Sequence, residues 1–298
     1  MKLRFTKMHG AGNDFVFFED LADELTLAPE QVRFLCDRHM GIGADGVIVV
    51  KPSDKDDCLA YMHYLNSDGT LAEMCGNGVR CFSKYLVDNR IAEPGATSLI
   101  ADTLAGPRPI EYVVDPEGML VLASVDMGLP ITDPAQVPTT LQPTFTHPDL
   151  GPVVREQPIE TPMGPLAFTC VSMGNPHAIA FVDDPSRFPV AEVGRFIEQH
   201  EVFPEKTNVE FASVHEGACG FEIEMRVWER GCGETLACGT GCCATEVAAA
   251  LCERAPREAD LKVLGGTLHV KWDADTGHVI MTGPATTVYH GVIELPEG

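Results

Sequence analysis

The chain has 298 residues, 45% of them hydrophobic and 22% charged, and a formal net charge of −23 at pH 7. This length predicts about two domains of an ordinary globular protein, and the acidic surface argues against nucleic-acid binding because it repels phosphate backbones. No apolar run reaches the roughly 18 residues of a membrane helix, and residues 1–9 are too polar for a signal peptide, so we expect no membrane association.

Strands and helices alternate along the chain. Hydrophobic periodicity and helix signals predict the following, in order: a strand over 15–20, a helix from Pro29 through Asp37, strands over 46–50 and 59–65, a helix over 78–88, strands over 178–184 and 221–228, and a buried helix over 242–252. Residues 130–165 are rich in proline and are expected to be mostly loop.

The eleven cysteines are expected to be free thiols in a reducing cytoplasm, because an odd number cannot pair completely and no export signal is present. Most are expected to act as small core residues, namely Cys36, Cys58, Cys170, Cys219, Cys242, Cys243 and Cys252. No Cys-x-x-Cys pair is present, so a zinc site is not expected.

Two cysteines stand apart because each opens a glycine-rich segment. Cys75-Gly76-Asn77-Gly78 and Cys238-Gly239-Thr240-Gly241 lie 163 residues apart. Other residues recur at matching offsets before them: the pairs Gly12-Asn13 and Gly174-Asn175, then Asp45 and Asn208, then Asn66 and Glu229. This register indicates an ancient duplication, with two similar halves facing each other.

The position of these cysteines suggests acid–base chemistry. A thiol at the start of a helix is expected to have a lowered pKa, and the free backbone N–H groups of the first turn can bind a carboxylate. With the two halves facing each other, one thiol would lie on each side of the carbon next to that carboxylate. Removing a proton from one face and returning one to the other inverts the stereocentre. No cofactor is expected for this reaction.

The segments around these residues resemble the diaminopimelate epimerase family. The resemblance is carried by 7–15, 66–69, 74–81, 174–177, 207–209, 229–241 and 288–291. It implies an α/β fold (α+β) of two pseudo-symmetric duplicated domains, each a curled mixed sheet around a central helix. The expected domains are 1–124 plus 287–298, and 125–286, since the C-terminal strand of the family returns to the first domain.

The resemblance also implies a reaction and a site. The family interconverts LL- and meso-diaminopimelate without a cofactor, in lysine and cell-wall precursor biosynthesis, and its members are usually homodimers. By resemblance, the acid–base pair is Cys75 and Cys238, and the reacting carboxylate is held by Gly76, Asn77, Gly239 and Thr240. The distal end of the amino acid is bound by Asn66, Asn175, Asn208 and Arg230. Asn13 lines the pocket, and the two thiols are tuned by His177 and Glu229. Glu229 is also expected to contact the substrate, and Tyr289 occupies the place of an interface tyrosine.

One departure concerns the first-half glycine loop. Many relatives carry a glutamine after the aspartate, whereas here Asp45 is followed by Gly46, so both residues are left out of the expected site.

Two other interpretations remain open. Another two-thiol racemase, for proline, hydroxyproline or histidine, is disfavoured because proline racemases carry histidine in place of Asn77 and a small cyclic substrate has no use for Arg230. A non-catalytic amino-acid-binding protein with structural cysteines would show no deuterium exchange at the α-carbon.

Overall fold

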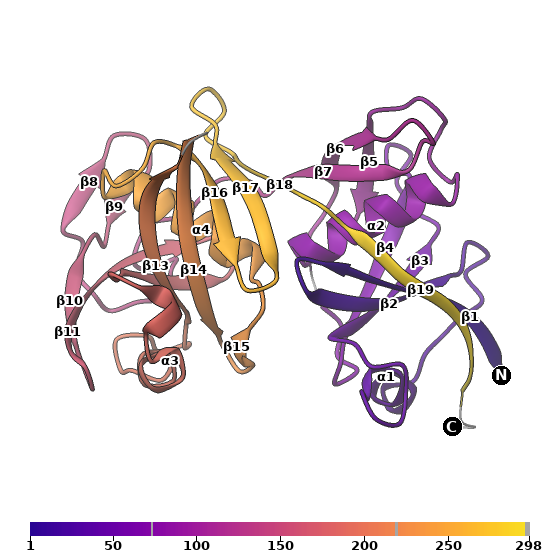
Figure 1. Ribbon diagram of the computed structural model, residues 1–298, viewed down its shortest axis with the longest axis horizontal. Helices are drawn as coiled ribbons and strands as arrows, with labels where there is room; N and C mark the ends of the chain where they lie inside the picture. The colour runs from indigo at the N-terminus through magenta and orange to yellow at the C-terminus, as the bar shows by residue number, and fades with distance from the viewer. Residues whose placement is uncertain (73, 218–219, 296–298) are drawn as a thin grey trace. The chain divides into compact units, whose positions relative to one another are not determined.

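The structure is a computed structural model and describes residues 1–72, 74–217 and 220–295. The chain divides into two compact units (Figure 1). Unit 1 consists of Met1–Asp126 and Thr282–Gly298, and unit 2 of Met127–Met281. Among the described residues, no helix is both long and apolar enough to cross a membrane.

Unit 1 is a curled mixed sheet with two helices. Its strands run in the spatial order β19, β1, β2, β3, β4, β5, β6, β7, and the pairs β2–β3 and β4–β5 are parallel while the others are antiparallel. The strand bounds are β1 (Lys2–Gly10), β2 (Asn13–Glu19), β3 (Gly46–Lys51), β4 (Ala60–Asn66), β5 (Ser98–Asp102), β6 (Arg108–Val114), β7 (Leu120–Asp126) and β19 (Thr286–Glu294). The helices are α1 (Pro29–Cys36) and α2 (Gly76–Asp88).

Unit 2 repeats this plan. Strands β10, β11, β12, β13, β14, β16 and β17 follow one another with β12–β13 and β14–β16 parallel. Their bounds are β10 (Gln157–Thr161), β11 (Gly164–Ser172), β12 (Pro176–Phe181), β13 (Asn208–Gly217), β14 (Gly220–Glu229), β16 (Glu258–Val263) and β17 (Gly266–Trp272). The remaining elements are β8 (Phe145–His147), β9 (Gly151–Val153), β15 (Gly233–Thr235), β18 (Val279–Gly283), α3 (Val190–Glu198), α4 (Gly239–Leu251) and a 3₁₀ turn (Pro185–Arg187).

The shared order confirms the predicted duplication and fold class. In unit 1 the C-terminal strand β19 pairs with β1, and in unit 2 β10 pairs with β11 in the same way. The glycine before each matched asparagine has a positive φ, 83° at Gly12 and 95° at Gly174, a conformation that favours glycine. Both halves therefore enter the first strand of their parallel pair through the same kind of turn.

A helix packs inside each curled sheet because its sequence is apolar on the faces that meet the strands. In α2, Val79, Phe82 and Leu86 have no exposed surface, as the spacing predicts. Helix α4 contacts six strands and is buried on almost every side. The outer face of each parallel strand pair is covered by a second helix, α1 in unit 1 and α3 in unit 2, so these strands read as nearly continuous hydrophobic runs.

Several cysteine predictions can be checked against this core. Cys36, Cys170, Cys242 and Cys243 are buried, and burial raises the pKa of the Cys36 and Cys170 thiols to about 12. The prediction for Cys58 is wrong, since it lies in the turn-rich loop before β4, half-buried and next to Asp57. Cys252 is half-buried beside Thr169, and Cys219 lies outside the described residues.

The proline-rich segment 130–165 is less irregular than expected. It contains a β8–β9 hairpin, strand β10 and the start of β11. Proline is tolerated there at short strands, as at Pro152 and Pro158.

Candidate functional site

Each glycine-rich motif begins a helix inside its unit, and the cysteine is the residue that precedes the first helical residue. Cys75 and Cys238 both have extended backbone conformations, and the first intrahelical bonds run from Val79 N to Cys75 O (2.8 Å) and from Cys242 N to Cys238 O (2.9 Å). The backbone N–H groups of residues 76–78 and 239–241 precede those bonds, so they have no acceptor within their helix. This arrangement favours an anion at both helix starts.

In unit 1, three candidate residues lie in contact. Asn13 Oδ1 accepts hydrogen bonds from the Cys75 thiol (3.3 Å) and from Asn77 Nδ2 (3.4 Å). The amide of Asn13 is held in this orientation because its Nδ2 donates to Asp45 Oδ2 at 2.7 Å. Arg80, which has no exposed surface, donates from Nη2 to Asn77 Oδ1 at 2.9 Å. Asp45, which is not among the expected site residues, therefore orients Asn13, which is one of them.

A charged network supports Asp45. Arg38 bridges Asp45 Oδ1 and Asp14 at 2.8 Å each, and Lys7 pairs with Asp14 at 2.6 Å. Burial opposes ionisation of Asp14, but hydrogen bonds from Arg38 and Lys7 outweigh it and hold the pKa of this carboxyl at about 2. The loop that carries Asp45 is thus fixed by ionised groups at neutral pH.

In unit 2, Cys238 is buried among acidic residues. Its Sγ lies 3.4 Å from Thr240 Oγ1, and it interacts with Glu229, whose carboxylate accepts a short hydrogen bond from Thr235 Oγ1. Burial raises the pKa of the Cys238 thiol well above its usual range, and the negative charges of Glu229 and Glu210 add to this, against hydrogen bonds from Thr240 and Gly241 N. Burial likewise raises the pKa of Glu229.

This overturns the expectation of a lowered thiol pKa at Cys238. The helix start does supply a hydrogen bond from Gly241 N, but loss of solvent and two nearby carboxylates outweigh it. The sequence shows the helix start but not which strand residues lie behind the thiol.

A buried pair of ionisable side chains lies behind the same helix start. Nδ1 of His177 and Oε1 of Glu210 are 2.7 Å apart, and neither side chain has exposed surface. The other ring nitrogen, Nε2, lies 3.0 Å from Asn175 Oδ1. A Cβ on Gly241 would lie 2.7 Å from Glu210 Oε1 and 3.4 Å from Cys238 Sγ, so a larger residue here would displace the Glu210 carboxyl group from its place behind the thiol.

The residues expected to bind the distal end of the substrate are divided between the units. In unit 2, Asn208 donates to Pro176 O (2.8 Å) and accepts from Arg230 N (2.9 Å), while the exposed Arg230 side chain donates to Glu205 O (3.1 Å). Asn208 thus positions the Arg230 backbone. In unit 1, Asn66 is half-buried and donates to Thr70 Oγ1 at 3.1 Å.

The strand registers explain why these residues lie close together in each unit, at the ends of neighbouring strands. Asn13 and Gly46 begin parallel strands and Asn66 ends the next, while Pro176 and Asn208 begin the equivalent strands and Glu229 ends the next. Phe15 pairs with Gly46 in unit 1, as His177 pairs with Asn208 in unit 2. Gly46, rather than Asp45, is therefore the counterpart of Asn208, which corrects the register inferred from the sequence by one residue.

Several supporting residues were not predicted from the sequence. They are Asp45, Arg80, Glu198, Glu210 and Thr235. Glu198, for example, accepts hydrogen bonds from Gly231 N (3.0 Å) and Trp228 Nε1 (2.8 Å). Their signal is a charged or polar residue in an otherwise apolar strand or helix, visible at Glu210 and Arg80.

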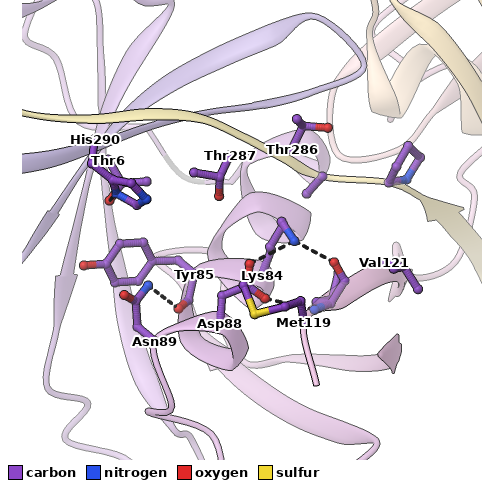
Figure 2. Close-up of a pocket in the computed structure, with 13 residues that line it drawn as sticks. Thr6, Lys84, Tyr85, Asp88, Asn89, Met119, Val121, Thr286, Thr287 and His290 are labelled. Atoms are coloured by element: carbon purple, nitrogen blue, oxygen red, sulfur yellow. Dashed lines mark hydrogen bonds and ion pairs between the residues drawn. The ribbon is translucent and has the colours of Figure 1, made fainter. Parts of the chain in front are cut away.

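Unit 1 also contains a cavity of about 540 Å³ away from these residues. Figure 2 shows side chains of α2 and β19 around it, with Lys84 between Asp88 and the β7 segment. Lys84 forms an ion pair with Asp88 (2.9 Å) and donates a hydrogen bond to Leu120 O (2.7 Å), so its ammonium group stabilises the fold of unit 1. The cavity lining includes none of the candidate site residues.

Comparisons with known proteins identify the family to which the chain is similar. The family model described as Diaminopimelate epimerase matches residues 5–132 and 169–288. Proteins named diaminopimelate epimerase are 42% identical in Methanococcus maripaludis (98% of this chain, 100% of the relative), 40% in Acetivibrio thermocellus (99% and 100%) and 44% in Synechococcus elongatus (99% and 99%).

Solved structures show the same fold at low identity. A phenazine biosynthesis protein of Bacillus anthracis has a TM-score of 0.70 at 15% identity (99% of this chain, 100% of the other), and a hydroxyproline epimerase of Agrobacterium vitis has 0.70 at 13% (98% and 92%). The relatives match this chain over its whole length at 40–44% identity. The chain therefore belongs to the diaminopimelate epimerase family, whose members are isomerases.

Proposed function

We propose that this chain interconverts LL- and meso-diaminopimelate by a cofactor-independent reaction in which Cys75 and Cys238 act as acid and base. One observation carries the proposal: in both repeats a cysteine directly precedes a helix whose first backbone N–H groups have no acceptor within the helix. Membership of the family supplies the substrate. The product would serve lysine and cell-wall precursor biosynthesis.

The proposed reaction moves one proton in and one proton out. A thiolate on one face takes the α-proton, so the C–H bond breaks and an S–H bond forms. The thiol on the other face gives its proton to the α-carbon and becomes the thiolate. The backbone N–H groups of Gly76, Asn77, Gly239 and Thr240 would hold the reacting carboxylate and the negative charge that develops next to it.

The raised pKa of the Cys238 thiol supports an assignment within this pair. A protonated Cys238 is ready to donate, and Cys75 takes the complementary part when the substrate has its α-proton on that side. The reverse reaction exchanges the two roles.

Distal recognition would separate diaminopimelate from smaller amino acids. The Arg230 guanidinium is exposed in unit 2, and Asn208 accepts a hydrogen bond from its backbone N–H. Its planar fork would bind a carboxylate in place of the Glu205 carbonyl to which Nη1 now donates. We assign Asn66 and Asn175 to the same end of the substrate, Asn13 to the pocket wall, and His177 and Glu229 to tuning of the thiols.

We also propose a cytoplasmic homodimer. Val288, Tyr289 and Val292 on β19 are exposed, at 51%, 44% and 63%. Large apolar side chains gathered on one strand favour contact with a second copy of the chain, with Tyr289 in the interface. Neither nucleic acids nor membranes are expected partners of so acidic a chain.

Pure protein incubated with LL-diaminopimelate in deuterium oxide, without added cofactor, tests the function. We expect meso-diaminopimelate to form with deuterium at the inverted carbon. Binding without exchange would favour an amino-acid-binding protein, and comparable turnover of proline or hydroxyproline would favour a different racemase.

A further inference from the structure

The two repeats differ in what lies behind their cysteines. The third residue after Cys75, Gly78, faces apolar side chains: a Cβ there would lie 3.3 Å from Ile48 Cδ1 and 3.6 Å from Phe15 Cζ. The equivalent residue after Cys238 is Gly241, and a Cβ there would lie 2.7 Å from Glu210 Oε1 and 3.4 Å from Cys238 Sγ. The Glu210 carboxyl group and the Cys238 sulfur therefore both lie next to Gly241.

The strand registers show that this is a substitution within a shared framework. Ile48 pairs with Phe17 in unit 1, and Glu210 pairs with Ile179 in unit 2. Two residues earlier along the same strands, Phe15 and His177 occupy matching places. The apolar residues Phe15 and Ile48 of unit 1 therefore occupy the positions that the hydrogen-bonded residues His177 and Glu210 occupy in unit 2.

The fold does not need this carboxylate for its own stability. Glu210 Oε2 is buried and has no hydrogen-bond partner in the described part of the chain, while Oε1 is satisfied by His177. A half-satisfied buried carboxylate destabilises a fold relative to an apolar side chain of similar size, and unit 1 has such an apolar side chain at this place. The presence of a carboxyl group at this place therefore calls for a functional reason.

We propose that Glu210 is a positioning residue for Cys238: held by its hydrogen bond to His177, it places a carboxyl group behind this thiol where unit 1 has the apolar Ile48, and it thereby makes the two cysteines unequal. This deepens the proposed function and rests on it for its catalytic meaning. Cys238 would then supply its proton to the α-carbon, with the S–H bond breaking as the C–H bond forms.

Among the described residues, two acidic side chains act on Cys238 from the strands packed against α4, Glu229 at the end of β14 and Glu210 on β13. His177 on β12 is hydrogen-bonded to Glu210. Glu229 and Glu210 both act to raise the pKa of the thiol. Glu229 is already among the residues assigned to tuning, so the test must change Glu210 alone.

The test measures the alkylation rate of Cys238 by neutral iodoacetamide against pH, with modified peptides quantified by mass. In wild type we expect the midpoint to lie above the roughly 8.5 of a free thiol. In Glu210→Gln we expect it to fall by at least about one pH unit, which is about a tenfold faster alkylation at a fixed pH below the midpoint. The Cys75 profile in the same digests should not move.

A matched control is available on the same helix. Glu246→Gln replaces a different buried carboxyl group, one that lies on α4 about two turns beyond Cys238, and it should leave the Cys238 midpoint unchanged. An unmoved or raised midpoint in Glu210→Gln would overturn the proposal. So would a wild-type midpoint at or below about 8.5, a result that does not depend on whether the variant folds.

These readouts need no turnover. If the midpoint shifts as expected but diaminopimelate is not epimerised, the proposed function fails while the role of Glu210 beside the thiol stands. If epimerisation occurs and the midpoint does not move, the inference fails alone. In the active enzyme the pH profile of kcat should shift in the same direction as the alkylation midpoint.

Discussion

Asn13 accepts a hydrogen bond from the Cys75 thiol, with 3.3 Å between Oδ1 and Sγ, and Asp45 fixes the orientation of the Asn13 amide from the other side. The contact joins the first residue of β2 to the residue that precedes α2. It gives the sulfur of Cys75 a defined direction, which acid–base catalysis at a single carbon requires.

Replacing Asn13 should therefore slow the reaction. Asn13→Ala is expected to lower kcat/KM by roughly 10- to 100-fold, because it removes a hydrogen bond worth about 1–3 kcal/mol at the reacting group. Steady-state kinetics with LL-diaminopimelate provide the measurement. Asn89→Ala is the matched control, since Asn89 bonds Tyr85 O at the other end of α2, and equal activity of the two variants would contradict this role of Asn13.

Arg230 should determine the choice between diaminopimelate and lysine. Lysine lacks the distal carboxylate, so wild type is expected not to racemise it appreciably, with a penalty on the order of 2–5 kcal/mol, or roughly 30- to 5,000-fold. Arg230→Met should lose diaminopimelate activity by a similar factor and narrow the gap to lysine. The measurement is kcat/KM for both substrates with wild type and with Arg230→Met. Efficient use of lysine by wild type would contradict the role of Arg230 in binding the distal carboxylate.

Mild oxidation should inactivate the enzyme reversibly. Two thiols that act on opposite faces of one carbon approach disulfide range when no substrate is bound, so we expect a Cys75–Cys238 bond that reductant breaks. Peptide mapping of the inactive protein checks this. Because Cys232 is exposed and is an alternative target of oxidation, Cys232→Ala is the control and should be inactivated in the same way as wild type; both active-site thiols found free in inactive protein would refute the prediction.

Glu246 should make stability depend on pH. Burial, with a smaller effect of Glu258, raises its pKa from 4.5 to about 8, and its side-chain oxygens are buried without a hydrogen-bond partner among the described residues. The carboxyl is then neutral in the folded state and ionised in the unfolded state between these two values. The free energy of unfolding should therefore fall as pH rises from about 4.5 to about 8, by a few kcal/mol at most.

Denaturant unfolding of wild type and Glu246→Gln between pH 5 and 8 measures this contribution. The variant should lack most of the decline, so the difference between the two proteins should grow toward pH 8. A constant difference across this range would show that Glu246 titrates normally.

Some features of the fold and the site could be predicted from the sequence, and others depend on contacts between distant strands. The repeated Cys-Gly-x-Gly motif and the matched Gly-Asn pairs are local signals, so the duplication and both helix starts could be anticipated. The family resemblance implied only that Asn13 lines the pocket, and its contact with Cys75 was not predicted. The residues behind the thiols come from the middles of strands, and only the strand registers show that Glu210 lies behind Gly241 and Ile48 behind Gly78. The raised pKa of Cys238 follows first from burial of the thiol and then from Glu229 and Glu210, so the helix start alone predicted the wrong direction.

If one thiol takes the proton and the other gives it, neither suffices alone. The rate of epimerisation of LL-diaminopimelate by folded Cys75→Ala and Cys238→Ala tests this directly, with Cys242→Ala as the control for a buried cysteine of α4 outside the site. We expect each of the first two variants to lose at least about 10³-fold in kcat, while Cys242→Ala stays close to wild type. Turnover near the wild-type rate by either Cys75→Ala or Cys238→Ala would contradict the two-cysteine mechanism.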